Sequence, residues 1–308
     1  MKTVALAGGV GGAKLIEGLS KVLKPKDLTV VVNTGDDFIH LGLKICPDLD
    51  TVCYTLAGYA NPVTGWGRSQ ETWMALETLG ILGGPTWFRI GDQDLGLHLE
   101  RTRRINEGFS LSKITGQFCA AFGVEVKVLP MSDDDVQTTV ITKEGELPFQ
   151  EYFVHQACRP LITGFRFDGI DNAAPASGVL KAIQSADQIV FCPSNPWVSL
   201  DPILAVSGIK RALLDKKKVV GVSPIIGGTT LKGPAAKMYT ELGISPSALA
   251  VANHYKDLLT HFVFDRIDAS LDASIQNLGL KTKVTNTIMK TQDEKYRLAK
   301  EVLEFGGR

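Results

Sequence analysis

Short apolar runs alternate with longer amphipathic stretches along most of the 308-residue chain. Continuous runs such as Leu28–Val32 are typical of parallel strands covered on both faces, and apolar positions at helical spacing predict helices between them. This alternation predicts an α/β fold, a Rossmann-like, mostly parallel sheet with helices on both faces. The predicted strands are 3–7, 28–32, 124–129, 188–192, 219–222 and 261–264, and the predicted helices are 13–23, 51–56, 72–79, 112–122, 178–185, 203–214, 234–242, 255–259 and 293–305.

Two segments depart from this pattern. In 124–129, valines alternate with Glu125 and Lys127, which predicts a strand near the edge of the sheet. In 137–169, β-forming stretches at 138–142 and 149–154 flank a polar turn and predict a hairpin. We therefore expect a single α/β domain over 1–308, with a core of about 1–135 and 175–308 and a β-hairpin and helical insertion at about 136–174.

The composition of the chain argues against several classes of binding partner. Basic and acidic residues balance at 33 each, so no global field favours a nucleic acid. The five cysteines are widely spaced, which argues against a disulfide framework and a zinc knuckle and suits a reducing compartment. No apolar stretch approaches the roughly 18 residues that span a bilayer. We expect a cytoplasmic protein without a membrane partner and, by default, a homodimer.

The first candidate site is the glycine-rich loop that follows strand 3–7. Its residues are Gly8, Gly9, Gly11 and Gly12, with Lys14 at the start of the next helix. Glycines let backbone amides approach an anion, and a helix N-terminus attracts negative charge. The loop lacks the third glycine of the dinucleotide fingerprint and the Gly-Lys-Ser/Thr of a P-loop. The alternative is a tight turn with no ligand.

Acidic residues follow the second strand. Asp36 and Asp37 lie in a glycine turn, and Asp48 and Asp50 lie at the start of the helix predicted over 51–56. Carboxylates beside a phosphate site favour a divalent cation, because bare like charges repel. The alternative is that these residues cap a turn or a helix.

Later loops add small polar groups and aromatic rings. The segments 193–197 and 223–228 follow predicted strands, and Lys232 precedes a helix that begins with proline. Together with the glycine loop they predict a ligand with more than one phosphate. Trp66 and Arg89 lie in segments where tryptophan accompanies arginine, an arrangement suited either to stacking a flat ring or to ordinary packing. Gly-x-Ser-x-Gly and a histidine pair at metal spacing are both absent from the sequence.

Eight motifs together resemble the 2-phospho-L-lactate transferase family of coenzyme F-420 biosynthesis, nearly end to end and in order. They are Gly8–Lys14, Val32–Asp37, Cys46–Thr51, Gly65–Gly67, Gly91–Asp94, Leu129–Asp133, Pro193–Pro196 and Ser223–Gly227. The resemblance implies transfer of a phospho-acid (lactate-, enolpyruvate- or glycerate-derived) from a guanosine diphosphate-linked donor. The acceptor is the ribityl hydroxyl of the deazaflavin Fo, and GMP is released with Mg²⁺ as cofactor.

The resemblance also assigns roles to residues. It implies Asp37 and Asp50 as catalytic and metal-binding residues, and Asp50, Arg89 and Trp66 as the acceptor (Fo) site. We assign the nucleotide to Gly8, Gly9, Gly11, Gly12, Lys14, Ser194, Asn195, Pro196, Gly227, Gly228, Lys232 and Gly233. The alternatives are a non-catalytic nucleotide-binding regulator of a related sugar-metabolism family and, less favoured, a nicotinamide dehydrogenase, which would want an acid where Asn33 stands.

Overall fold

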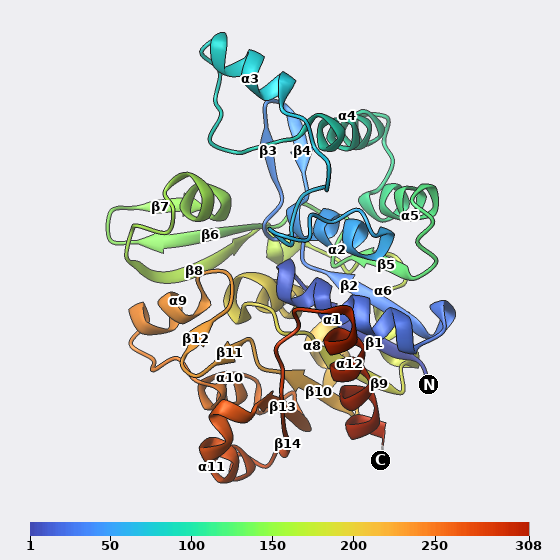
Figure 1. The fold of residues 1–308 in the computed structure, drawn as a ribbon, viewed down its shortest axis with the longest axis vertical. Coiled ribbons are helices and arrows are strands. Elements are labelled where there is room, and N and C mark those ends of the chain that lie inside the picture. Colours follow the sequence, from blue (N-terminus) through green and yellow to red (C-terminus); the bar gives the residue numbers. More distant parts are fainter. Residues whose placement is uncertain (308) are drawn as a thin grey trace.

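A seven-stranded parallel sheet forms the centre of the computed structural model, which describes residues 1–307 (Figure 1). Every pairing within this sheet is parallel, so the carboxyl ends of its strands meet at one edge. In sheet order the strands are β14 (Lys281–Thr285), β13 (His261–Asp265), β10 (Val219–Val222), β9 (Gln188–Phe191), β1 (Thr3–Ala7), β2 (Leu28–Val32) and β5 (Lys127–Pro130).

The strand order reverses between β1 and β9. The chain builds β1, β2 and β5 in one direction and then returns to add β9, β10, β13 and β14 in the other. In open α/β sheets, ligands bind at such a switch point, outside the carboxyl ends of the strands. The crevice between the ends of β1 and β9 is therefore the place where a ligand site is expected.

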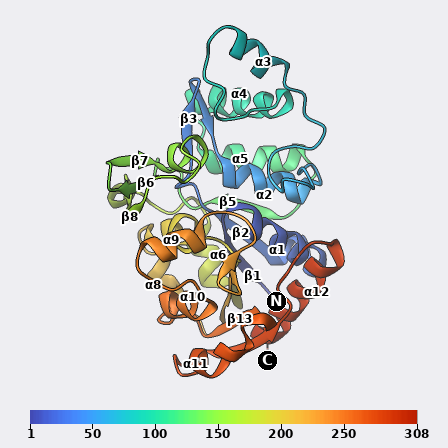
Figure 2. The ribbon, with the colours of Figure 1, turned by 60° about the vertical axis from the view of Figure 1, so that its left-hand side comes forward.

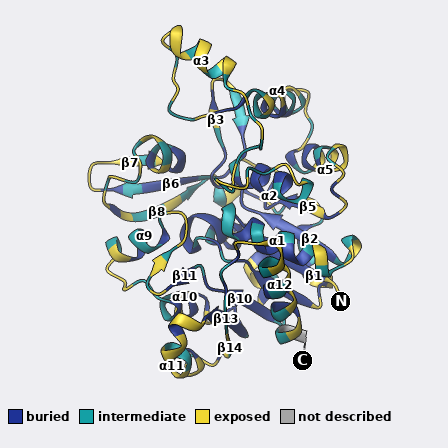
Figure 3. Ribbon diagram, in the orientation of Figure 1, coloured by how far each residue is buried: buried dark blue, intermediate teal, exposed yellow. Residues whose placement is uncertain are grey.

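Helices cover both faces of the sheet, and the side chains of β1 divide between two hydrophobic layers. Val4 and Leu6 pack with α6, α8, α9 and α10, whereas Ala5 and Ala7 pack with α1, α2, α5 and α12. Figure 3 shows the strands as the most buried part of the molecule. The helices are α1 (Gly9–Val22), α2 (Pro47–Ala57), α3 (Met74–Ile81), α4 (Asp92–Asn106), α5 (Leu111–Ala121), α6 (Val179–Ser185), α7 (Asp201–Ala205), α8 (Ile209–Leu214), α9 (Ala235–Glu241), α10 (Ala248–Tyr255), α11 (Asp272–Gln276) and α12 (Gln292–Gly307).

An arm projects from the sheet between α2 and α5. It contains α3 and α4, which lie with the hairpin β3–β4 (Phe38–His40, Leu43–Ile45) at one end of the long axis in both views (Figures 1 and 2). The predicted insertion forms a separate antiparallel sheet of β7 (Glu146–Pro148), β6 (Gln137–Thr142) and β8 (Ile162–Asp168). A short two-stranded ribbon, β11 (Ile225–Ile226) and β12 (Thr229–Thr230), follows β10.

The structure confirms the predicted fold class and places β5 at an edge of the sheet, as its alternation indicates. The strand predicted over 149–154 is wrong, because Glu151–His155 forms a helical turn. Phe149 stacks on Phe153 four residues on, and Tyr152 is fully buried, so packing overrides β propensity. The helix predicted over 203–214 is divided at Gly208, which has φ of 82°.

Other boundaries also move. The helix α1 begins inside the glycine loop, and α2 begins at Pro47 rather than Thr51. The helix predicted over 255–259 lies earlier, as α10. Within residues 1–307, none of the helices combines the length and the apolar character that crossing a bilayer requires.

Candidate functional site

The glycine loop and the loop after β9 meet across the switch point. The Ser194 hydroxyl accepts a hydrogen bond from the Gly8 amide at 3.1 Å and donates to the Gly8 carbonyl at 2.8 Å. A Cβ at Gly11 would clash with the Pro193 carbonyl, and one at Gly12 would lie 2.7 Å from the Ser194 hydroxyl. The close approach of these two loops is therefore one physical reason for the glycines.

The N-terminus of α1 already faces a carboxylate of the protein. The amide of Gly9, a residue with φ of 66°, donates to Asp48 at 2.7 Å, and Asn33 donates its side-chain amide to the same carboxylate at 2.9 Å. Burial raises the pKa of Asp48 to about 6, although these two hydrogen bonds favour its ionised form. Asp48 is therefore bound at the N-terminus of α1, the same place where the sequence predicts a bound phosphate.

Asp36 and Asp37 are buried beside this carboxylate. Among the described residues, neither oxygen of Asp37 has a hydrogen-bond partner, and Asp36 has one oxygen without a partner. Burial raises the pKa of Asp37 to about 7, and the Lys44 ammonium at 4.0 Å offsets only part of that effect. Burial, Asp48 and Asp37 raise the pKa of Asp36. These carboxylates are costly to ionise without a cation.

The same carboxylates fit a hard divalent cation such as Mg²⁺, which prefers oxygen ligands. The unpartnered oxygens of Asp36 and Asp37 are ligand atoms of this kind. The Asp48 carboxylate lies close enough to Asp36 to raise its pKa. Such a cation would favour the ionised forms of these carboxylates, whose pKa values are raised mainly by burial. Among the described residues, ligand atoms of Asp50, Asp94 and His98 converge to within 4.8 Å, whereas those of Asp36, Asp37 and Asp48 do not, so a cation held by these three carboxylates would have to draw their side chains together.

Asp50 lies in electrostatic range of Asp37 but belongs to a different network. Both of its oxygens accept hydrogen bonds from the guanidinium of Arg101, a residue of α4 that is 2% exposed. His98 lies 3.1 Å from that guanidinium, and ligand atoms of Asp50, Asp94 and His98 lie within 4.8 Å of one another. Arg101 pairs with Asp50 in this group, so the three side chains form part of an ion-pair network, and the role of Asp50 as a metal ligand stays a prediction.

Two lysines gather at the N-terminal side of α1. Burial, then the charges of Lys232 and Lys295, lower the pKa of Lys14. The Lys232 ammonium donates to the carbonyls of Val63, at 3.2 Å, and Thr64. The structure therefore brings Lys14 and Lys232 together from opposite ends of the chain and ties Lys232 to the loop that carries Trp66.

The remaining predicted nucleotide residues lie on loops at the same edge of the sheet. Asn195 accepts from the Trp197 amide at 3.1 Å, and the Pro196 carbonyl accepts from a tyrosine hydroxyl of α10. Gly227 donates its amide to Asp268 at 3.0 Å. Gly227, Gly228 and Gly233 all have positive φ, as a turn-rich loop requires.

The predicted acceptor residues belong to different segments of the structure. Trp66 is 49% exposed, and its loop passes over the first turn of α1, where a Cβ at Gly65 would contact Val10. Arg89 is exposed and lies over the ring of Trp73 at 4.3 Å, at the base of α3. Arg89 thus belongs to the arm, and Asp50 is linked to the same arm through Arg101.

Sequence reasoning missed Arg101 and His98 because it predicted no helix over 92–106. A signal was present, since Asp94, His98 and Arg101 are spaced i, i+4 and i+7 and so share one face of a helix. Such a stripe of complementary charges indicates a buried partner. Asn33, which binds Asp48, was noted only as an argument against a dehydrogenase.

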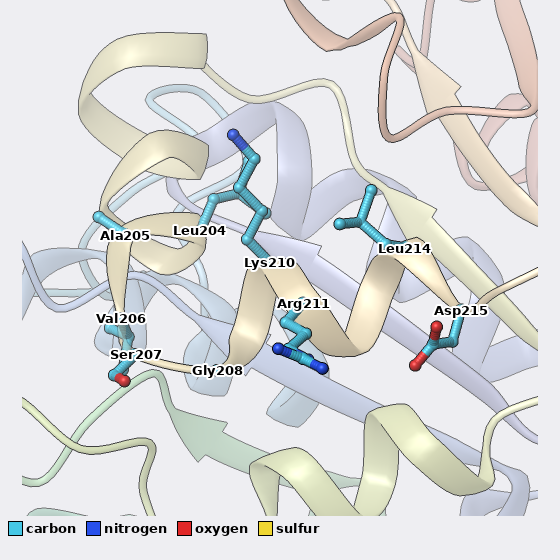
Figure 4. Close-up of a pocket in the computed structure, with 9 residues that line it drawn as sticks. All are labelled: Leu204, Ala205, Val206, Ser207, Gly208, Lys210, Arg211, Leu214 and Asp215. Atoms are coloured by element: carbon cyan, nitrogen blue, oxygen red, sulfur yellow. The ribbon is translucent and has the colours of Figure 1, made fainter.

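A separate hollow of about 760 Å³ lies on the helical layer around α7 and α8 (Figure 4). Lys210 and Arg211 give it positive charge, but it contains none of the predicted site residues. The residues that line it are Leu204, Ala205, Val206, Ser207, Gly208, Lys210, Arg211, Leu214 and Asp215. The candidate site therefore remains at the switch point of the sheet.

Known proteins resemble this chain over its whole length. A structure of a UPF0052 family member from Bacillus halodurans superposes with a TM-score of 0.66, at 17% identity over 98% of both chains, which supports the fold. A phosphoenolpyruvate transferase of Streptomyces griseus is 42% identical over 99% of this chain and 98% of its own length. A 2-phospho-L-lactate transferase of Methanosarcina barkeri is 36% identical over 97% of both.

The family model described as 2-phospho-L-lactate transferase CofD matches residues 3–302. Those residues include both sides of the switch point, the buried carboxylates and the paired lysines described above. The names of the relatives favour an enzyme over the regulator and dehydrogenase alternatives. The chain therefore belongs to the 2-phospho-L-lactate transferase CofD family and is a transferase of coenzyme F-420 biosynthesis.

Proposed function

We propose that this transferase moves a phospho-acid from a guanosine diphosphate-linked donor to the ribityl hydroxyl of the deazaflavin Fo and releases GMP. The observation that carries the proposal is the pair of buried carboxylates, Asp36 and Asp37, which follow β2, the strand beside β1, and have oxygens without hydrogen-bond partners among the described residues. Carboxylates with raised pKa values at a ligand crevice are typical of a catalytic site.

Donor binding is assigned to the α1 side of the crevice. The amides of the first helical turn lack intrahelical acceptors, and the Lys14 and Lys232 ammonium groups repel one another there. A diphosphate bound here would attract both ammonium groups, and it would meet Asp48 at the Gly9 amide. The loops of Ser194–Pro196 and Gly227–Gly233 complete the proposed nucleotide site.

The proposed chemistry depends on positioning and charge. When bound, Mg²⁺ supplies neutralisation of the phosphate charge, and the fitting donors are Asp36, Asp37 and Asp48. Asp37, buried and without a hydrogen-bond partner among the described residues, is suited to orient the acceptor hydroxyl. Asp50 is held in one orientation by Arg101, which suits a residue that binds an acceptor hydroxyl.

We further propose that the donor acid is enolpyruvyl rather than lactyl or glyceryl. The relative at 42% identity is named a phosphoenolpyruvate transferase, whereas the relative at 36% is named a 2-phospho-L-lactate transferase. A competition among the three donors tests this choice.

The test offers the enzyme Fo, Mg²⁺ and equal concentrations of the lactyl, enolpyruvyl and glyceryl donors. We expect GMP release and one dominant product, which mass spectrometry identifies as the enolpyruvyl adduct. An Arg89→Ala variant, folded by circular dichroism, should no longer change the fluorescence of Fo. Lys256→Met, which changes an exposed residue of α10's end, is the matched control.

Each part of the proposal has its own contradicting result. No GMP release with any donor, while the wild type binds Fo, would refute the transfer reaction. If the wild type does not change the fluorescence of Fo, the proposal that Fo is the acceptor would be refuted. A dominant lactyl or glyceryl product would refute only the choice of acid.

A further inference from the structure

Two cysteine thiols lie in contact where the arm joins the body of the protein. The Sγ atoms of Cys53 and Cys119 are 3.5 Å apart, although 66 residues separate them in sequence. Cys53 belongs to α2 and Cys119 to α5, two helices that pack together. Both are almost buried, at 6% and 4% exposure, within one apolar layer.

The other cysteines lack this arrangement. All five cysteines are within the described residues, and Cys53 with Cys119 is the pair whose sulfur atoms lie in hydrogen-bonding range. Cys46 and Cys192 are fully buried, and Cys158, half-buried, donates to a backbone carbonyl at 3.8 Å. The proximity is therefore specific to one pair.

A cross-link between Cys53 and Cys119 would join the two ends of the segment that forms the arm. The chain leaves α2 after Cys53, forms the arm with α3 and α4, and returns in α5, where Cys119 lies. A bond between the two sulfurs would close the loop 53–119 at its base. Closing a long loop restricts the unfolded chain and should stabilise the arm.

We propose that Cys53 and Cys119 form a reversible intramolecular disulfide when the protein meets a peroxide. The Cys119 thiolate attacks one oxygen of hydrogen peroxide and expels hydroxide, which takes up the thiol proton as water, leaving a sulfenic acid. The Cys53 thiol then attacks that sulfur, and the second water leaves. Two thiols are oxidised by two electrons and one peroxide is reduced to two waters.

The electrostatic environment supports this order of attack. The hydrogen bond with Cys53 lowers the pKa of Cys119, whereas that hydrogen bond and burial raise the pKa of Cys53. A thiol of lower pKa supplies more thiolate, which is the reactive form. Cys119 is therefore the attacking residue and Cys53 the resolving one.

The test uses the full chain carrying Cys158→Ser, which removes the half-buried thiol and its intermolecular reactions. The folded protein is treated with hydrogen peroxide, quenched with catalase, unfolded and alkylated. We expect a mass lower by two hydrogen atoms before alkylation, two thiols lost to alkylation, and a linked peptide pair containing Cys53 and Cys119. The oxidised form should unfold at a higher temperature, and dithiothreitol should reverse both changes.

Two further variants serve as controls. Adding Cys53→Ser should abolish the cross-link and leave Cys119 to gain oxygen in mass, whereas adding Cys192→Ser should leave the cross-link unchanged. The proposal is overturned if both thiols still alkylate after peroxide has fully oxidised glutathione in the same sample. A linked peptide pair that involves another cysteine would overturn it equally.

Discussion

The carboxylate of Asp48 accepts a hydrogen bond from the Gly9 amide at 2.7 Å and so occupies the N-terminus of α1. Asn33 fixes the other oxygen of Asp48 at 2.9 Å. We expect a phosphate of the donor to bind at the same helix N-terminus, because the amides there are oriented toward an anion. The protein's carboxylate and the ligand's phosphate therefore repel one another unless a cation lies between them.

Replacing Asp48 with Asn keeps an oxygen for the Gly9 amide and removes the charge. Without Mg²⁺, we expect GDP to bind about fivefold more tightly, since removing the repulsion at the helix end contributes on the order of 1 kcal/mol. With Mg²⁺, turnover should fall because a cation ligand is lost. Isothermal titration calorimetry measures the first effect, with the exposed Asp215→Asn as control. Weaker metal-free binding would show that Asp48 supports the donor instead.

The raised pKa of Asp37 makes the stability of the metal-free protein depend on pH. The carboxyl loses its proton near pH 4 when unfolded but near pH 7 when folded. Between these values the folded state binds more protons, so the free energy of unfolding falls as pH rises. We expect Asp37→Asn to raise that free energy at pH 8 by up to about 4 kcal/mol and to leave it nearly unchanged at pH 4.

Mg²⁺ should counteract the fall in the free energy of unfolding at high pH. It should raise the melting temperature of the wild type more at pH 8 than at pH 5.5, because the ligands must be ionised to bind it. Thermal unfolding with and without Mg²⁺ measures the difference, and Asp37→Asn should show little response. An equal Mg²⁺ response in wild type and variant would exclude Asp37 from the cation site.

The sequence predicted the sheet well because its central strands are continuous β-branched runs, such as Leu28–Val32, whose type does not depend on distant partners. It missed β14, since four of the five residues of Lys281–Thr285 are polar, as an edge strand allows. It also missed α4, a mostly polar helix whose buried residues are few. Hydrophobic periodicity alone therefore does not reveal these two elements, although the spacing of Asp94, His98 and Arg101 is a polar signal for α4.

Some features of the candidate site could also be predicted from the sequence, and others could not. Parallel strands deliver their carboxyl ends to one edge, so the order of motifs correctly placed the glycine loop beside Ser194. The choice between individual aspartates could not be made from sequence, because it depends on which carboxylate meets a counter-charge. Arg101 neutralises Asp50 across 51 residues, and that contact exists only in the folded chain.

Breaking the Asp50–Arg101 pair from either side should destabilise the protein. Both groups are buried, so Arg101→Met leaves an unpaired carboxylate and should cost about 3–5 kcal/mol, and Asp50→Asn should cost a similar amount. The double variant should recover part of the loss. Urea unfolding measures all three, with Arg103→Met, on the exposed side of α4, expected to cost under about 1 kcal/mol. Strictly additive losses would show that the two side chains are not coupled.

Lys232 should link donor binding to the position of the Trp66 loop. Its ammonium is bonded to the Val63 and Thr64 carbonyls and also lies close enough to Lys14 to lower that lysine's pKa. A phosphate that attracts this ammonium would therefore pull on the loop. In Lys232→Met, we expect GDP to bind about tenfold more weakly, since a charge-assisted hydrogen bond contributes about 1.5–3 kcal/mol.

The same variant separates a direct contact from a general loss of affinity. In the wild type, GDP should change the fluorescence of Trp66, which we isolate by comparison with Trp66→Phe. In Lys232→Met, saturating GDP should no longer produce that change, because the loop has lost its connection to the ligand. Lys256→Met should behave as the wild type. A Trp66 response that persists at saturation in Lys232→Met would mean that the ligand moves the loop by another route, such as the packing of Gly65 over Val10.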